Sequence, residues 1–224
     1  MIISDPIEKR KYTDKYKIED LFSIPITSYL EVHSYKKGEF ICKELDTLSY
    51  LYFLVEGRAK MYQTHKNGKV SLIHFYSCGT ILGEVELLGV SKTAHSVQAM
   101  IDTVCIQLPL YNMRDEILND AKFLREIARH LCVKLLRDTD NLISSQAYTL
   151  ETRLAAFILF SNTNNLYEEK HTEVSQYLGV SYRHLLRVLS DFCKRGLLVK
   201  EDRGYRINNS ASLKSIVDEM SEIK

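Results

Sequence analysis

The chain has 224 residues, which is enough for one large domain or two small ones. Its hydrophobic fraction of 45% and charged fraction of 26% are those of a globular protein, so composition excludes a disordered or fibrous chain. The formal net charge of +1 points to no nucleic-acid or membrane partner, and a case for such a partner has to come from local arrangement.

The start of the chain and its cysteines bear on the cellular compartment. No stretch of about 18 apolar residues occurs, and residues 1–12 carry charges where a signal peptide needs an apolar run. We therefore expect a cytoplasmic protein without a membrane partner. The cysteines are far apart and form no CxxC pair, which argues against a disulfide framework and against a structural zinc site. We expect reduced and mostly buried thiols at Cys42, Cys78, Cys105, Cys132 and Cys193.

Residues 31–108 show the pattern of short strands with one face buried. Apolar runs such as Tyr50–Val55 alternate with glycine or polar turns. Two of these runs flank Asn67-Gly68, and Asn-Gly between strands is a strong hairpin signal. Because Gly57, Gly68 and Gly79 stand eleven residues apart, the sequence predicts a small roll of antiparallel strands.

Beyond Pro109 the apolar residues recur at alternating steps of four and three, which predicts a long helix with a heptad seam. Asp138 is the polar break in this seam. A stripe this narrow usually meets a copy of itself, so we predict a dimer; the alternative is a helix that lies on its own domain's core. The predicted dimer residues are Ile117, Ala121, Leu124, Ala128, Leu131 and Leu135, and Leu142 continues the spacing.

The last third of the chain predicts a second domain. After the polar residues 144–146, a helical pattern covers Leu150–Phe160, and two shorter helices, a hairpin and a closing helix over Leu213–Met220 follow. The predicted fold class is therefore α+β. Its three parts are an amino-terminal sensor roll over residues 1–112, a dimerisation helix over 113–143 and a carboxy-terminal domain over 144–224.

Residues 172–189 predict two helices joined by a tight turn. Thr172 is placed to cap the first helix and Ser181 to cap the second. Gly179 lies where the chain reverses, because a left-handed backbone conformation costs glycine little. Since a hairpin over 197–207 follows directly, the segment predicts a winged helix-turn-helix.

The second of these helices has one apolar face, formed by Leu185, Leu186, Val188 and Leu189. Its polar side chains suit a helix that enters the major groove amino end first, where arginine bonds guanine bidentately. The alternative is a solvated face on a structural helix. Between Thr172 and Arg206 seven Lys/Arg stand against four Asp/Glu, and phosphate binding requires such a local excess. We predict contacts to double-stranded DNA from Thr172, Ser181, Tyr182, Arg183, His184, Arg187, Lys200 and Arg203.

Three strings carry a family resemblance: Gly79–Glu84 at the end of the roll, Arg153–Leu159, and Tyr177–Leu186. With them the chain resembles the Crp/Fnr family of bacterial regulators, in its YeiL-like branch, over all but its amino-terminal tip. The resemblance implies a cyclic-nucleotide-binding-like roll and a transcription regulator rather than an enzyme. It also implies a homodimer on a palindromic DNA site. Such proteins commonly recruit RNA polymerase as activators, and the direction of control stays open here.

The expected effector site departs from the family pattern. Family members that bind cyclic AMP hold its phosphate with a Gly-Glu pair and an Arg-Ser/Thr-Ala string. This chain retains Gly83-Glu84, but the arginine position falls on Thr93, and a hydroxyl cannot replace a guanidinium that bonds and neutralises a phosphate. Adjacent Lys92 offers only a point charge. The effector-site candidates are thus Gly83, Glu84, Lys92 and Thr93, and we expect no dependence on cyclic AMP.

Other family cofactors find little support in the sequence. Oxygen sensors of the family bind an iron–sulfur cluster through a cysteine-rich amino terminus, whereas the first cysteine here is Cys42. We therefore expect no cluster of that type, haem is no better supported, and the cofactor stays unknown. A redox role for Cys78, Cys105 or Cys132 is the alternative to inert thiols.

The predicted recognition helix departs from the family as well. The usual helix presents an arginine and a glutamate where this chain has Tyr182 and Arg183, and Arg187 alone matches the third reading position. With no carboxylate to accept from a cytosine amino group, we expect a half-site that differs from the common family sequence.

Two rival functions follow from the same residues. A metal-dependent barrel enzyme would use histidines on the predicted strands, with Glu84 nearby. Metal-binding barrels generally carry His-x-His on one strand, which is absent here, so we expect no enzyme. A regulator whose roll is a ligand-free platform for protein contacts is the second rival, and the sequence leaves it open. The histidines are His33, His65, His74 and His95.

Overall fold

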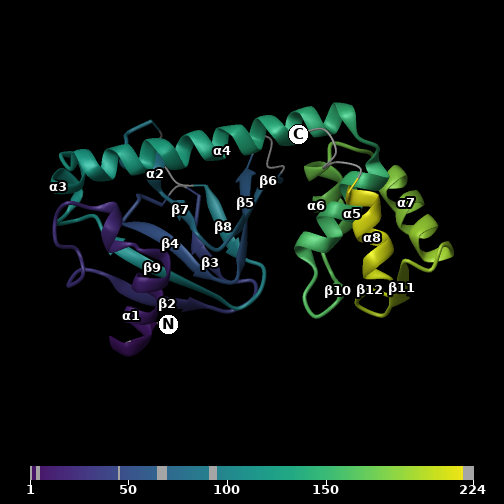
Figure 1. Ribbon diagram of the computed structural model, residues 1–224, viewed down its shortest axis with the longest axis horizontal. Helices are drawn as coiled ribbons and strands as arrows, with labels where there is room; N and C mark the ends of the chain where they lie inside the picture. The colour runs from purple at the N-terminus through teal and green to yellow at the C-terminus, as the bar shows by residue number, and fades with distance from the viewer. Residues whose placement is uncertain (1, 4–5, 45, 65–69, 91–94, 219–224) are drawn as a thin grey trace. The chain divides into compact units, whose positions relative to one another are not determined.

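The computed structural model describes residues 2–3, 6–44, 46–64, 70–90 and 95–218. The chain divides into two compact units, residues 1–135 and residues 136–224. Each unit is described by itself. Helix α4 (Ala121–Ala147) runs across the boundary and belongs in part to both (Figure 1).

Two antiparallel sheets form the roll of the first unit (Figure 1), as predicted from the apolar runs. One sheet contains, in spatial order, β1 (Ile2–Ile3), β2 (Glu31–Tyr35), β9 (Thr103–Pro109), β4 (Tyr50–Glu56) and β7 (Thr80–Leu82). The other contains β3 (Phe40–Cys42), β8 (Ser96–Ala99), β5 (Arg58–Thr64) and β6 (Val70–Ser77). The predicted Asn67-Gly68 turn lies outside the described residues, but the strands on either side of it pair from Thr64 and Val70 onward.

Strand β4 is buried on both faces, which explains why its sequence is a continuous apolar run rather than an alternating one. Phe53 belongs to a core that the helices of the first unit cover. Its neighbour Leu54 points the other way, because successive strand side chains alternate, and packs with Cys105 between the two sheets. The roll therefore has two cores that share β4.

Short helices close the first unit: α1 (Pro6–Tyr16), the 3₁₀ turn η1 (Glu19–Leu21), α2 (Glu84–Leu87) and α3 (Arg114–Leu118). The start of α4 packs against the segment that follows η1. Phe22 stacks on Phe123 of α4, with ring centroids 4.6 Å apart, and Phe123 is fully buried. The first turns of α4 are thus part of the core of the roll.

Asp120 determines where α4 begins. One carboxylate oxygen accepts from the backbone N–H groups of Lys122, at 3.0 Å, and Phe123, at 3.2 Å, which is the geometry of a helix N-cap. The same carboxylate also accepts from the backbone N–H and the hydroxyl of Ser23, at 2.6 and 2.8 Å. This buried residue therefore both starts the helix and holds the segment after η1.

The cap corrects part of the dimer-seam prediction. Ile117 lies in the separate helix α3 and is fully buried in the core of its own chain, so it cannot meet a partner. The periodicity suggested one continuous helix because α3 happens to continue the heptad spacing. At the other end, α4 extends through the polar residues 144–146 to Ala147, where a break was expected.

The second unit contains a small sheet and four helices besides the end of α4, within the described part of the chain. The sheet has the order β10 (Leu166–Tyr167), β12 (Gly204–Ile207) and β11 (Leu198–Glu201). The helices are α5 (Leu150–Ser161), α6 (His171–Tyr177), α7 (Tyr182–Lys194) and α8 (Ser210–Asp218). This order of elements is the predicted winged helix-turn-helix.

The cysteines are more exposed than predicted. Cys105 is buried, Cys42 and Cys193 are half-buried, and Cys78 and Cys132 are exposed; all are free thiols. Burial raises the pKa of the Cys105 thiol above its ordinary range, which keeps it protonated and inert. Among the described helices, none has the length and apolarity that crossing a membrane requires.

We predict that Asp120→Ala lowers the free energy of unfolding by about 1–2 kcal/mol, the worth of a helix cap. Burial works to raise the pKa of Asp120, but the Ser23, Phe123 and Lys122 donors outweigh it and lower that pKa below 3.8. The stabilisation should therefore be complete above pH 3.8 and disappear as the pH falls through the lowered pKa. Denaturant unfolding at pH 7 and at a series of lower pH values measures both. Exposed Asp115→Ala is the control, and an Asp120→Ala protein as stable as this control at pH 7 would contradict the cap.

Candidate nucleic-acid interface

Helices α6 and α7 meet at a tight turn built around Gly179. This residue has a φ of +65°, in the left-handed region that the sequence predicted for it. Ser181 then caps α7, since its hydroxyl accepts from the backbone N–H of His184 at 3.2 Å. The predicted cap at Thr172 is wrong. Helix α6 already begins at His171, so Thr172 lies inside the first turn, where its carbonyl accepts from Ser175.

Helix α7 has one buried and one exposed face. Leu185, Leu189 and Phe192 are fully buried and recur at helical spacing. Leu186 and Val188, predicted as part of the same stripe, are only half-buried. The residues predicted to contact DNA occupy the outer side: Tyr182, Arg183 and Arg187 are exposed, and His184 is half-buried.

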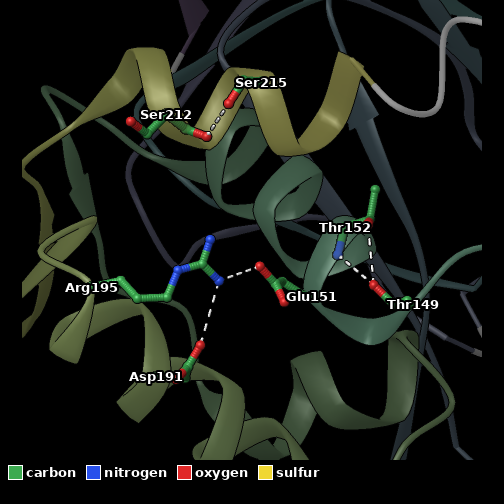
Figure 2. A network of polar contacts seen from close by, with 7 residues as sticks. All are labelled: Thr149, Glu151, Thr152, Asp191, Arg195, Ser212 and Ser215. Atoms are coloured by element: carbon green, nitrogen blue, oxygen red, sulfur yellow. Dashed lines mark hydrogen bonds and ion pairs between the residues drawn. The ribbon is translucent and has the colours of Figure 1, made fainter.

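An ion-pair network that the sequence analysis missed holds the end of α7 against α5. Figure 2 shows Arg195 between Glu151 of α5 and Asp191 of α7. Arg195 bonds directly to Glu151 and lies 3.4 Å from Asp191. Thr149, also drawn in Figure 2, caps α5 by accepting from the backbone N–H of Thr152 at 3.3 Å. The pair with Glu151 links the end of α7 to α5, and because these two residues are 44 apart in sequence, no local pattern could reveal it.

Arg153 supports the turn itself. Its guanidinium donates to the backbone carbonyl of Leu178 at 2.8 Å, directly before Gly179. Desolvation lowers the pKa of Arg153, yet an arginine stays charged under all ordinary conditions. The side chain therefore acts on the turn from inside the unit and does not belong to the exposed surface.

The wing is the hairpin of β11 and β12. Its second strand starts at Gly204, where an added Cβ would lie 2.1 Å from the carbonyl oxygen of Tyr167, so β10 and β12 approach as closely as they do only because of this glycine. Lys200 and Arg203, both predicted to contact DNA, are exposed on the hairpin. Arg206 instead pairs with Glu201 at 2.6 Å.

The ion pairs select which basic side chains remain for a ligand. Of the seven Lys/Arg between 172 and 206, Arg195 and Arg206 have carboxylate partners within the unit. For the others the described residues provide no ion pair, and all are exposed: Arg183, Arg187, Lys194, Lys200 and Arg203. The positive charge of α7 and the wing is therefore concentrated on side chains that face solvent.

The effector-site candidates in the roll are only partly described. Gly83, with φ +94°, opens α2, and Glu84 follows with 2% of its surface exposed. Lys134 of α4 forms a direct ion pair with Glu84 and also donates to the carbonyl of Ile81 at 3.2 Å. The one carboxylate of the candidate site is thus already neutralised from within the chain. Lys92 and Thr93 lie outside the described residues.

The described histidines that a metal-dependent enzyme would use do not gather at one site. His33 pairs with Glu31 at 2.9 Å, and His74 is buried against the ring of Tyr76. Within the ranges that the structure describes, no three His, Cys, Asp or Glu side chains gather as metal ligands would. His65 lies outside these ranges.

The predicted seam residues of α4 differ in exposure. Ala121, Ala128 and Leu135 are exposed, and Leu124 and Leu131 are half-buried. Other apolar residues on α4 are exposed as well: Val133, Leu136, Leu142 and Ile143. A helix whose apolar side chains remain uncovered to this extent is unusual for an isolated subunit.

Comparison with known proteins places these two units in one family. Residues 32–120 match the cyclic nucleotide-binding domain, and residues 152–216 match the Crp-like helix-turn-helix domain. The chain is 40% identical over 202 residues to regulatory protein YeiL of Escherichia coli O157:H7, covering 90% of this chain and 92% of that protein.

More distant relatives agree. The fumarate and nitrate reduction regulatory protein of Salmonella typhimurium is 23% identical over 81% of this chain and 76% of its own length. The crystal structure of a Crp/Fnr-family regulator from Eubacterium rectale has the same fold, with a TM-score of 0.72, 16% identity, and coverage of 96% of this chain and 98% of that one.

The roll, the winged helix-turn-helix and these matches define a DNA-binding transcription regulator rather than an enzyme. The chain belongs to the Crp/Fnr family, in its YeiL-like branch.

We predict that Lys134→Met lowers the free energy of unfolding by about 3 kcal/mol, because it leaves the buried Glu84 carboxylate without a counter-charge. Combining it with Glu84→Gln removes both charges and should restore most of that loss. Urea unfolding of the three variants measures the difference, and Lys11→Met on the exposed side of α1 is the matched control. A double variant no more stable than Lys134→Met would contradict this account of the pair.

Proposed function

We propose that the chain binds a two-fold symmetric DNA site as a homodimer, with one α7 helix in the major groove of each half-site. The observation that carries this proposal is the arrangement of α7. Ser181 caps this helix, and Leu185 and Leu189 are buried on its inner side. Arg183 and Arg187 are exposed on its outer side. An arginine in this position can bond guanine O6 and N7 bidentately.

The wing supplies contacts of a different kind. Lys200 and Arg203 lie on a hairpin rather than on the helix, which suits phosphate contacts that position the protein without reading bases. Thr172 at the start of α6 and Ser181 before α7 also lie on the exposed side. We assign them to the backbone contacts, together with His184, and assign base reading to Tyr182, Arg183 and Arg187.

The dimer is proposed from the uncovered face of α4. Leu135 is 66% exposed and Leu142 63% exposed, one heptad apart. Because Ile117 is buried in its own chain, it is left out of the proposed seam. The seam consists of Ala121, Ala128 and Leu135, with the half-buried Leu124 and Leu131 at its edge. Two such faces would bury each other in parallel, and the two-fold axis they create is the symmetry of a palindromic operator.

The three parts of the chain then have separate roles. We assign sensing to residues 1–112, dimerisation to the helical region 113–143 and DNA binding to 144–224. Since Lys134 neutralises Glu84, we infer that cyclic AMP is not the effector. Because the target is DNA, we infer a cytoplasmic location, and contact with RNA polymerase is the route to activation that the family resemblance supports.

We predict that Arg187→Ala relaxes preference at one base pair by about 1–3 kcal/mol, since it removes one bidentate contact. Lys200→Ala should weaken all sequences alike and reduce the salt dependence by about one phosphate contact. Selection of bound sites from random DNA identifies the operator first, and titrations at several salt concentrations follow.

Lys214→Ala, on exposed α8, is the matched control and should bind like the unmodified protein. If Arg187→Ala, like Lys200→Ala, weakens binding to selected and random duplexes equally, α7 does not read bases. Selected sites without two-fold symmetry would contradict the dimer geometry.

We predict that Leu135→Glu separates the dimer, because two carboxylates would face each other across an apolar contact. Sedimentation velocity measures the change in mass. Val133→Glu is a matched control on the other flank of α4, where Val133 is 50% exposed, and should leave the dimer intact. A Leu135→Glu protein that remains dimeric would rule out this seam.

A further inference from the structure

A cavity of about 260 Å³ lies between the roll and the first half of α4. Its floor includes Phe53 and Val55 of β4 and Ile81 of β7, and Ile18 also lines it. Residues of α4 form the opposite wall. All of these elements belong to the first unit, and the floor side chains are almost fully buried.

The wall from α4 differs in character from the floor. It consists of Glu126, Arg129, His130 and Val133, which recur three and four residues apart and therefore share one flank of the helix. At about 100° per residue, this flank is roughly opposite the one that carries Leu135. A second copy on the proposed seam would leave the cavity accessible.

The α4 side of the cavity is largely polar. Arg129 is 77% exposed in its side chain and pairs loosely with Glu126, at 3.7 Å. His130 is oriented by the backbone N–H of Ile81, which donates to its Nε2 at 3.3 Å. Arg129 is the exposed cation of the lining, so it is the group that an anionic ligand would meet.

Volume and charge together restrict the occupant. The cavity is larger than the roughly 150 Å³ that holds a benzene molecule, and smaller than the roughly 300–1,000 Å³ of sites for drug-sized ligands. Its lining is apolar apart from Tyr16, Thr80 and the polar side chains of α4, among which the guanidinium of Arg129 can bond a carboxylate through two parallel N–H groups. We propose that this cavity is a binding site for a small apolar carboxylate, with the ring or short acyl chain against β4 and β7 and the carboxylate on Arg129.

Such a ligand would compete with Glu126 for Arg129. Binding would exchange a loose, exposed pair for a charge-assisted contact next to an apolar surface. It would also lie beside Ile81, the residue of β7 that bonds both His130 and Lys134 of α4. The site is distinct from the Glu84 region inside the roll, and the inference does not depend on DNA binding.

Titration calorimetry on the full chain tests the proposal, with phenylacetate and hexanoate as probes and their uncharged amides as comparison. We expect saturable binding of the carboxylates and at least tenfold weaker binding of the amides. Arg129→Gln should weaken the carboxylates about tenfold, because a hydrogen bond to a charged group is lost. Glu126→Gln, which removes the competing carboxylate, should strengthen them.

Val133→Trp locates the site by filling it, and Val90→Trp, at an 80% exposed valine away from the cavity, is the matched control. We expect binding to be lost in the first and retained in the second, with unchanged unfolding midpoints. Hydrogen exchange should slow at residues 79–81 and 126–133 when phenylacetate is added. Absence of saturable binding, equal binding of acids and amides, or equal binding by Val133→Trp would overturn the proposal.

Discussion

The rest of the structure depends on the way one flank of α4 is buried against the roll. Phe123 and Ile127 are completely enclosed by the core of the first unit, while Leu135 on the adjoining flank is uncovered. Because residues three and four apart share a helix face, a single helix can belong to one domain's core and still present a second apolar face outward. The roll and any partner of α4 are thereby connected through one rigid element.

In the second unit, helix α7 likewise has to be held in the core on one side and exposed for binding on the other. Helix α7 is held by Leu189 and Phe192 on its inner side and by the Arg195 network at its end. These contacts lie on its inner side and at its end, whereas Arg183 and Arg187 on the outer face are exposed and have no ion pair among the described residues. Arg195 and Arg206 show the other outcome, since a basic residue with an internal carboxylate partner contributes little field to a ligand.

The sequence was informative where the physical signal is local. Apolar runs separated by turns predicted the strands of the roll, and a capping serine after a glycine turn predicted α7, because both signals lie within a few neighbouring residues. The predicted cap at Thr172 was wrong because a hydroxyl near a helix start fits the first turn as well as the cap position. The prediction of Ile117 as a dimer residue was wrong because periodicity does not reveal the two-residue break between α3 and α4, at which Asp120 lies. The Lys134–Glu84 pair joins residues 50 apart, so only the fold brings them together.

The edge of the roll explains why α4 and β7 have to act together. Strand β7 is the last strand of its sheet, and an edge strand leaves backbone groups without a neighbouring strand. At Ile81 both groups are satisfied by α4, the N–H by His130 and the carbonyl by Lys134, one helical turn apart. The helix thus takes the place of a further strand. Displacing α4 would leave two buried backbone groups of Ile81 without hydrogen-bond partners and the Glu84 carboxylate without its counter-charge. A signal that moves this helix therefore has to move β7 with it.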